Sequence, residues 1–356
     1  MGKIRAGVIG AGSWAAVAHL PALRDRDDVE IVAICRKGDQ LLANLKEEFP
    51  VGIASEDYMD VVNQELDIII VASPPSLHHE HVSAALRSGA HVLCEKPMTI
   101  SSEDSWDLVN IAMQVKRELL VGFSWNYMPM VQQAFEQLQT KGIGELEQIN
   151  IQMATQTREL LANLGPYPGA SAVQIPEQNT WTNPINSGGG YGQAQLSHAL
   201  ALAFRLQPQR VSEAFAFMSS PLNAPVELHD AISYKFSNGA IGTLSGGSSH
   251  MGAWQNKDEL QIRAIGDEGQ FLIDLHRECL YFWYVDGTEI NVKLSPNAGA
   301  VDNFAAANAL VDVALGNLAA NRAPGELGAL TVEALELAYQ SAALGKIAKS
   351  KGISRK

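Results

Sequence analysis

The sequence predicts an α/β protein with an N-terminal doubly wound parallel sheet and a C-terminal α/β domain that has a large, mainly antiparallel open sheet. Strand-like and helix-like segments alternate up to residue 123, which is typical of a parallel sheet covered on both faces. Beyond that point, strand-like segments follow one another in series, which is typical of antiparallel pairing. We therefore expect two domains, 1–123 and 124–356, a division that 356 residues allow.

The strands of the first domain are expected to be buried on both sides, because their apolar runs are continuous rather than alternating. They cover Lys3–Ile9, Val29–Cys35, Asp67–Ser73, His91–Leu93 and Leu119–Phe123. Helical patterns lie between them, including Gln40–Phe49 and Ser101–Lys116.

The second domain begins with a helix, Met130–Lys141, and an alternating strand, Glu145–Gln156. A loop rich in Gly, Pro and Asn is expected over about Leu164–Gly190, followed by a helix that carries His198. Turn signals at 237–239 (SNG) and 286–287 (DG) then predict hairpins in an antiparallel sheet of six or more strands. Its later strands are expected at Val211–Met218, Ala231–Phe236, Ala240–Leu244, Leu260–Ile265, Phe271–Leu275, Leu280–Val285 and Glu289–Leu294, before closing helices at Val301–Leu318 and Leu330–Lys349.

Composition narrows the class of partner. The formal net charge of −13 argues against nucleic acid and anionic membranes. There is no apolar run of about 18 residues, so no membrane span is expected, and the opening MGKIRAGVIGAG lacks the apolar core of a secretory signal. Three widely spaced cysteines, Cys35, Cys94 and Cys279, predict free thiols and a cytoplasmic location.

A glycine motif follows the first predicted strand. VIGAGSWA places G-x-G-x-x-A at Gly10, Gly12 and Ala15, between a strand and a helix. In that context Gly10 permits a tight turn, Gly12 lets the backbone approach a pyrophosphate, and Ala15 allows close helix packing. The motif predicts a dinucleotide site.

The end of the second predicted strand indicates which dinucleotide binds. A ribose 2′-hydroxyl is usually held by an acidic residue there, but AICRKGD has Arg36 and Lys37. A guanidinium suits a 2′-phosphate, so we expect NADP. The alternative is that both are solvated loop charges and that Asp39 binds the ribose of NAD.

Five stretches together make the chain resemble the glucose–fructose oxidoreductase / inositol dehydrogenase / rhizopine-catabolism (Gfo/Idh/MocA) family. They are VIGAGSWA with HLPAL, VASPPSLHHEHVSAALRSGAHVLCEKP, VGFSWNYMP, the GGG segment with the His198 helix, and GALTVEALELAYQSAALGK. The resemblance implies a Rossmann domain and a second domain whose open sheet forms a homodimer or homotetramer. It also implies hydride transfer between a nicotinamide and a sugar, polyol or related carbonyl or alcohol.

The segment CEKP is the family's most telling one. By resemblance, Glu95 and Lys96 lie beside the nicotinamide, Pro97 is often cis, and Lys96 contacts the reacting oxygen. A cation there would stabilise a developing alkoxide, and a desolvated lysine can titrate near neutrality. The cofactor-binding residues implied are Gly10, Gly12, Ser13, Trp14, Arg36, Lys37, Ser73, Pro74, Pro75, His78, Glu95, Lys96 and Trp181.

The run SPPSLHHEH raises the alternative of a metal site at His78, His79, Glu80 and His81. His78 and His81 have helical i,i+3 spacing, but neither a cysteine pair nor an HExxH motif accompanies them. In the family, the PPxxLHxE motif lines one side of the nicotinamide pocket and binds no metal, so no metal is expected.

The helix after the triple glycine departs from the family pattern. The family has an aspartate four residues before the histidine, whereas Ala194 stands four residues before His198, with Gln195 beside it. Asn126 and Thr182 likewise replace family arginines. The resemblance implies His198 and Lys96 as catalytic residues. It implies a substrate pocket from Lys96, Trp125, Tyr127, Tyr191, Gln195 and His198, although aromatic residues equally suit a core.

Two functions follow from these residues. The first is an active NADP-dependent oxidoreductase in which Lys96 and His198 suffice. The second is a non-catalytic dinucleotide-binding sensor or regulator of the same fold, which the alanine at 194 favours.

Overall fold

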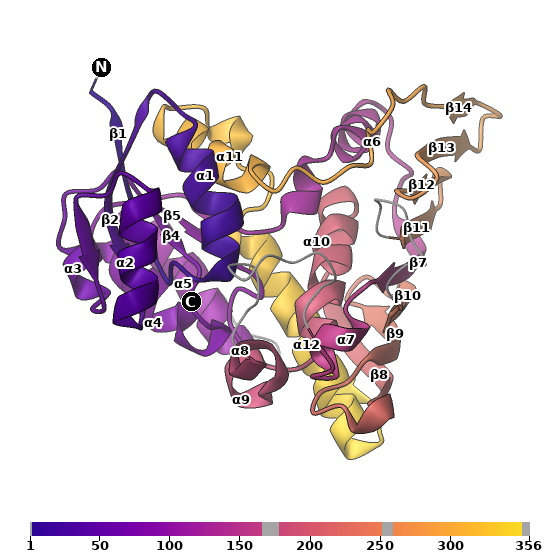
Figure 1. The fold of residues 1–356 in the computed structure, drawn as a ribbon. Helices are drawn as coiled ribbons and strands as arrows, with labels where there is room; N and C mark the ends of the chain where they lie inside the picture. Colours follow the sequence, from indigo (N-terminus) through magenta and orange to yellow (C-terminus); the bar gives the residue numbers. More distant parts are fainter. Residues whose placement is uncertain (1, 166–177, 251–258, 351–356) are drawn as a thin grey trace.

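The structure, a computed structural model, describes residues 2–165, 178–250 and 259–350. It contains two sheets with helices packed between and around them (Figure 1). The first sheet has six strands in the order β3-β2-β1-β4-β5-β6, and the second has nine in the order β14-β13-β12-β11-β7-β10-β9-β8-β15. The predicted fold class is confirmed.

All pairings in the first sheet are parallel, as expected from the alternation of strands and helices. Its strands are β1 (Ile4–Ile9), β2 (Val29–Cys35), β3 (Ile53–Ser55), β4 (Ile68–Val71), β5 (His91–Cys94) and β6 (Leu119–Val121). Its surrounding helices are α1 (Leu20–Arg24), α2 (Asp39–Glu48), α3 (Met59–Val62), α4 (His78–Arg87) and α5 (Ser102–Val115). The sequence did not predict β3, because three half-buried residues form no recognisable apolar run.

The strand order reverses between β1 and β4, which lie side by side although β2 and β3 separate them in the chain. In open parallel sheets, ligands bind at such a switch point, beyond the carboxyl ends of the strands. The glycine motif follows β1 and Ser73 follows β4, so both lie at this point.

The second sheet is mixed rather than purely antiparallel, because β7 pairs in parallel with β10 and antiparallel with β11. Strand β7 thus joins two hairpin groups that form separately along the chain, β8–β10 and β11–β14. The strands are β7 (Leu146–Thr155), β8 (Val211–Ser219), β9 (His229–Phe236), β10 (Ile241–Ser248), β11 (Glu259–Gly266), β12 (Gly269–Asp274), β13 (Cys279–Tyr284), β14 (Glu289–Asn291) and β15 (Ala348–Lys349). Both predicted hairpin turns are present.

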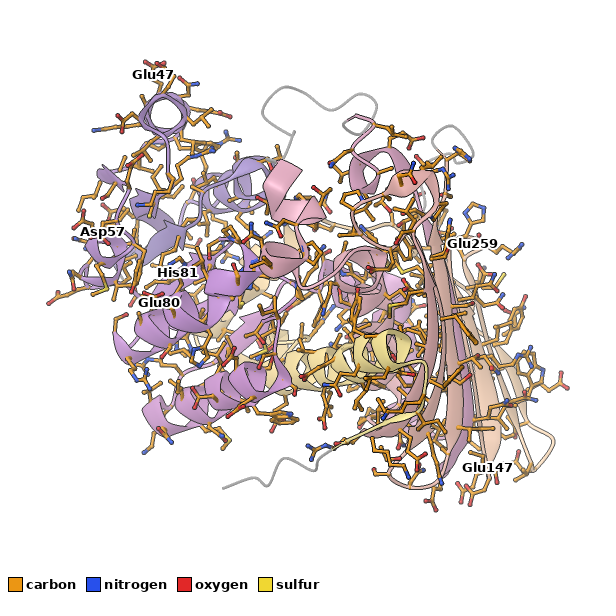
Figure 2. All side chains as sticks on the ribbon, turned by 90° about the horizontal axis from the view of Figure 1, so that it is seen from below. Glu47, Asp57, Glu80, His81, Glu147 and Glu259 are labelled. Carbon is orange, nitrogen blue, oxygen red and sulfur yellow. The ribbon has the colours of Figure 1, made fainter. Side chains whose placement is uncertain are left out.

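Helices lie on one face of this sheet. Figure 2 shows the yellow helix α12 on one side, and the side chains of Glu147 and Glu259 on the other. The helices of this domain are α6 (Pro129–Thr140), α10 (Ser197–Leu206) and α12 (Gly325–Leu344), with the short α7 (Arg158–Leu161), α8 (Gln178–Thr182) and α9 (Pro184–Ser187). The predicted loop 164–190 therefore contains two short helices, and its residues 166–177 lie outside the described residues.

Two closing helices connect the domains. Helix α11 (Ala305–Ala314) packs on β4, β5 and α1 of the first sheet (Figure 1). Helix α12 contacts α5 as well as β8 and α10, and it begins earlier than the predicted Leu330. Helix α12 also contacts β6, and Gly328 permits this approach, because a Cβ there would lie 2.7 Å from Met98 and Val121. The domain boundary at 123/124 stays a prediction, and α11 packs across it.

All three cysteines are free thiols, as predicted. None of the helices in the described parts of the chain is both long and apolar enough to span a membrane.

Candidate active site

The glycine turn after β1 is shaped for close approach by a ligand. Gly10 has φ +80°, and a Cβ there would overlap the backbone of Ser73. Gly12 is open, since a Cβ would meet only the Gly10 carbonyl at 3.8 Å. The amide groups of Gly10 and Ala11 both donate to the Cys35 carbonyl, at 2.8 and 2.9 Å. The turn is thus fixed by β2 and leaves its outer side accessible, as a pyrophosphate requires.

The end of β2 places Arg36 beside this turn. Its Nη1 donates to the Ala11 carbonyl at 3.3 Å, and the side chain is half-buried. Lys37 is exposed, and Asp39 is exposed at the start of α2. Of the three charged candidates, Arg36 is therefore the one directed to the glycine turn.

A buried carboxylate lies under the site. Glu95 Oε1 accepts hydrogen bonds from Trp14 Nε1 at 3.0 Å and from His19 Nε2 at 2.8 Å. Burial raises the pKa of Glu95, but the hydrogen bond and charge of His19 outweigh it, so the pKa lies below its ordinary value. The carboxylate packs on Gly122, where a Cβ would lie only 2.6 Å from it. The sequence singled out neither His19 nor Gly122.

Lys96 follows Glu95 in the segment after β5. Its Nζ donates to the backbone carbonyl of Ala194 at 2.9 Å and lies 5.1 Å from the ring centroid of Trp181. Burial lowers the pKa of Lys96, and the negative charge of Glu95 only partly offsets this. The Lys96–Pro97 peptide bond is cis, as the resemblance implies.

His198 lies in the first turn of α10 and is 6% exposed. Its ring stacks on Trp125 with a centroid distance of 5.4 Å and contacts the edge of Phe123. Burial, and then the positive charge of Lys96, lower the pKa of His198 well below its ordinary value. The ring is therefore neutral at physiological pH, and its Nδ1 has no hydrogen-bond partner within the described residues.

The residues before α10 form a π-helical turn, Gly192–Leu196, which includes Ala194. Such turns occur mostly as single bulges and often at functional sites. Here the turn presents the Ala194 carbonyl to Lys96, so a neutral backbone oxygen contacts the lysine. The side chain of Gln195 is half-buried, and no hydrogen bond joins it to His198 in the described residues.

The triple glycine is held by a carboxylate that the sequence did not reveal. Both carboxylate oxygens of Glu227 accept from the Gly190 amide, at 2.8 and 2.9 Å, and Oε1 also accepts from Gly192 and from the Tyr339 hydroxyl at 2.6 Å. Burial raises the pKa of Glu227. Glu227 precedes β9 by two residues, and only the fold brings it to the glycines.

Two aromatic residues expected in the substrate pocket have other contacts in the structure. Tyr191 is fully buried and accepts a hydrogen bond from Thr155 on the second sheet. Tyr127 lines a different cleft, with Arg205 and Arg322. Both positions were inferred from closeness in sequence to site residues, which does not fix the direction of a side chain.

Two histidines, His78 and His81, hold the loop that follows β4 through contacts with Ser73. His78 is fully buried, with Nε2 2.7 Å from the Ser73 carbonyl and Nδ1 3.0 Å from the Pro97 carbonyl. It therefore connects the Ser73–Pro75 loop to the loop that carries Lys96. His81 binds the Ser73 hydroxyl at 2.9 Å, whereas His79 pairs with Asp107 at the surface.

His78 and His81 thus both contact Ser73, whereas His79 pairs with Asp107 and Glu80 accepts a hydrogen bond from the Tyr58 hydroxyl at 2.8 Å. In the parts of the chain that are described, no group of three or more His, Cys, Asp or Glu side chains is arranged to hold a metal ion.

The parallel sheet and the glycine turn define a dinucleotide-binding Rossmann fold, which a second, mixed sheet follows in the chain. Residues 4–123 match the GFO_IDH_MocA model, described as an oxidoreductase family with an NAD-binding Rossmann fold.

Curated relatives include D-glucoside 3-dehydrogenase of Escherichia coli, 28% identical over 40% of this chain and 41% of that protein. Another is the NADP(+)-linked scyllo-inositol 2-dehydrogenase of Bacillus subtilis, 31% identical over 31% of this chain and 30% of that protein. The chain thus matches less than half the length of these relatives. A levoglucosan dehydrogenase solved with NADH covers 99% of this chain and 100% of its own, with a TM-score of 0.74 and 17% identity, which extends the likeness of fold to the second domain.

Proposed function

We propose that this protein is an NADP-dependent oxidoreductase that transfers a hydride between the nicotinamide and a sugar, polyol or related carbonyl or alcohol. NAD is the alternative cofactor. The relatives named as sugar and inositol dehydrogenases support this class of substrate.

One observation carries the proposal. Lys96 of the first domain and His198 of the second lie close enough for the charge of one to lower the pKa of the other, in a buried region beyond the switch point. Two buried titratable groups with shifted pKa values, contributed by two domains, are typical of acid–base sites.

The bound dinucleotide would accept or supply the hydride. Lys96 would hold or release the accompanying proton at the substrate oxygen, because its lowered pKa lets it exchange a proton nearer neutral pH. In alcohol oxidation, a neutral Lys96 takes the hydroxyl proton. In carbonyl reduction, its ammonium group stabilises the alkoxide and donates the proton. His198 would serve as relay or as an orienting hydrogen-bond partner.

The glycine turn, Ser13 and Trp14 would hold the pyrophosphate side of the dinucleotide. Arg36 would bind the 2′-phosphate, since it already reaches the turn at Ala11. Ser73, Pro74, Pro75, Glu95 and Trp181 would enclose the nicotinamide. His78 would fix the loop of Ser73–Pro75 to the loop that carries Glu95.

The second candidate is a non-catalytic dinucleotide-binding sensor. The absence of a carboxylate at Ala194 favours it, because His198 then has no acid to orient it. A turnover screen of sugars and polyols with NADP and NAD separates the two. Oxidoreductase activity that Lys96→Ala abolishes supports the enzyme, whereas tight NADPH binding without turnover on the whole panel supports the sensor.

Assembly through the second sheet belongs to the same proposal. Its outer face carries Phe217 and Ile241, which are 69% and 55% exposed. Exposed apolar residues on an uncovered sheet face favour a homodimer or homotetramer.

A further inference from the structure

A second cleft lies apart from the candidate active site. It has a volume of about 880 Å³, within the range of small-molecule sites. Its walls come from α6, α10, α11 and the segment leading into α12, and Figure 1 shows α10 below α6 and α11. Neither Lys96 nor His198 lines it.

Two arginines meet in this cleft. Arg205, at the end of α10, donates from Nη1 to the backbone carbonyl of Arg322 at 2.6 Å and from Nη2 to Gln132 Oε1 at 2.9 Å. Both acceptors are neutral. Arg205 Nε is buried and has no hydrogen-bond partner in the described residues. The guanidinium of Arg322 lies 6.0 Å from the ring centroid of Tyr127.

The positive charge of this pair is not neutralised. Within residues 2–165, 178–250 and 259–350, neither guanidinium forms an ion pair. Burial, and then the charge of Arg322, lower the pKa of Arg205 to about 10, as expected for two neighbouring cations. Both arginines are half-buried, and a charge that is partly removed from water is stabilised by an ion-pair partner.

Two carboxylates also line the cleft, but they do not balance the arginines. Asp312 pairs with Arg26 at 2.7 Å, so its charge is already matched. Glu326 lies in the first turn of α12, where the helix dipole stabilises it. Arg26 also pairs with Asp28, so it is shared between two acids. Neither Asp312 nor Glu326 forms an ion pair with Arg205 or Arg322 within the described residues.

The arginines and aromatic side chains that line the cleft indicate which class of ligand would bind there. A guanidinium fork matches the geometry of carboxylate and phosphate oxygens. The rings of Tyr127, Phe135 and Phe204 provide apolar surface that a simple halide would not use. The Tyr127 hydroxyl is buried and lacks a hydrogen-bond partner among the described residues.

We propose that this cleft is a binding site for a small organic anion with a carboxylate or phosphate group, held by Arg322 and Arg205. The ligand would supply an ion-pair partner, which neither arginine has within the described residues. This site is independent of the dinucleotide site and of the proposed oxidoreductase activity.

The proposal is tested by calorimetric titration of the full chain, once with malonate and once with inorganic phosphate. Chloride keeps the ionic strength constant in both titrations. We expect saturable binding of at least one probe, and the probe that binds more tightly shows whether the site prefers a carboxylate or a phosphate. Saturating NADPH should not change the affinity of the protein for that probe. Arg322→Gln should weaken binding about tenfold or more, through the loss of a charge-assisted hydrogen bond. Arg322→Lys, which keeps the charge but not the fork, should weaken it less.

Arg24→Gln is the matched control, because Arg24 pairs with Asp25 on α1, outside the cleft. It should bind the probe as the parent does. Competition with NADPH would place the probe at the glycine turn and overturn the proposal. Absence of saturable binding of both probes, or unchanged affinity in a folded Arg322→Gln variant, would overturn it as well.

Discussion

The ammonium group of Lys96 donates a hydrogen bond to the backbone carbonyl of Ala194 over 2.9 Å. The carbonyl is offered by a π-helical turn, directly before the helix that carries His198. A neutral acceptor stabilises an ammonium ion less than a carboxylate does. The lysine is therefore held in position while burial keeps its pKa low.

Lys96→Ala should reduce turnover by about 10²–10⁴-fold, the usual contribution of a general acid–base group. The affinity for NADPH should change little, because the glycine turn and Arg36 remain. Steady-state kinetics and NADPH fluorescence titration measure the two effects. Lys46→Ala, at an exposed position of α2, is the control. Full activity of Lys96→Ala on a verified substrate would refute the catalytic assignment.

Ala194→Asp should raise the pKa of both Lys96 and His198, because a nearby carboxylate favours their protonated forms. In the alcohol-oxidation direction, the rate depends on neutral Lys96. The limb on which the rate rises with pH, the low-pH limb of the profile, should therefore move to higher pH. Ala194→Asn, of similar size but uncharged, should leave the limb in place, and an equal shift in both variants would show that charge is not the cause.

Arg36→Asp should weaken NADPH binding far more than NADH binding. The loss of one charge-assisted hydrogen bond to the 2′-phosphate corresponds to about 1.5–3 kcal/mol. Parallel titrations with the two dinucleotides measure the difference. Lys37→Asp should have a smaller effect, because Lys37 is exposed and Arg36 contacts the turn. Tighter binding of NADH than NADPH by the parent protein would contradict the NADP assignment.

Asp230 should make the free energy of unfolding fall as the pH rises. Burial, and then the charge of Glu227, raise its pKa from 3.8 to about 8, and neither carboxyl oxygen has a hydrogen-bond partner within the described residues. Between these two pKa values the folded state keeps a proton that the unfolded state has released. The contribution of Asp230 to the free energy of unfolding should therefore be fully present below pH 4 and be lost toward pH 8. In that range the free energy of unfolding should fall by up to about 1.4 kcal/mol per pH unit because of this group.

Urea unfolding of Asp230→Asn between pH 5 and 8 checks this contribution. The variant should be more stable than the parent at pH 8, and its unfolding free energy should depend less on pH. Asp25→Asn, at an exposed position after α1, should behave as the parent. If the unfolding free energy of Asp230→Asn depended on pH as steeply as that of the parent, the Asp230 carboxyl would not be protonated in the folded state.

Replacing both Phe217 and Ile241 by Glu should convert the proposed oligomer to a monomer. The introduced charges would have to be buried in an interface on the outer sheet face. Sedimentation velocity at micromolar concentration measures the state. Leu318→Glu, an exposed apolar position outside the sheet, is the control. A parent protein that is itself monomeric would contradict the proposal.

The sequence alone was sufficient for local features. Continuous apolar runs identified β1 and β2 to within a residue, because strands buried on both faces need no polar alternation. The glycine spacing identified the turn after β1, since only glycine tolerates the φ of Gly10 and its approach to Ser73. The wider pattern of motifs also indicated Lys96 and His198 as candidates.

Tertiary structure decided what depends on residues far apart in the chain. The parallel pairing of β7 with β10 joins strands about 90 residues apart, which no local pattern specifies. The same holds for Glu227 at the triple glycine, for the Ala194 carbonyl at Lys96, and for the meeting of Arg205 with Arg322. The sequence states which residue occupies each position. The orientation of its side chain and the groups that it contacts depend on packing in the tertiary structure. Packing gives Tyr191 a hydrogen bond with Thr155 and places Tyr127 in the wall of the second cleft, contacts that the sequence did not predict.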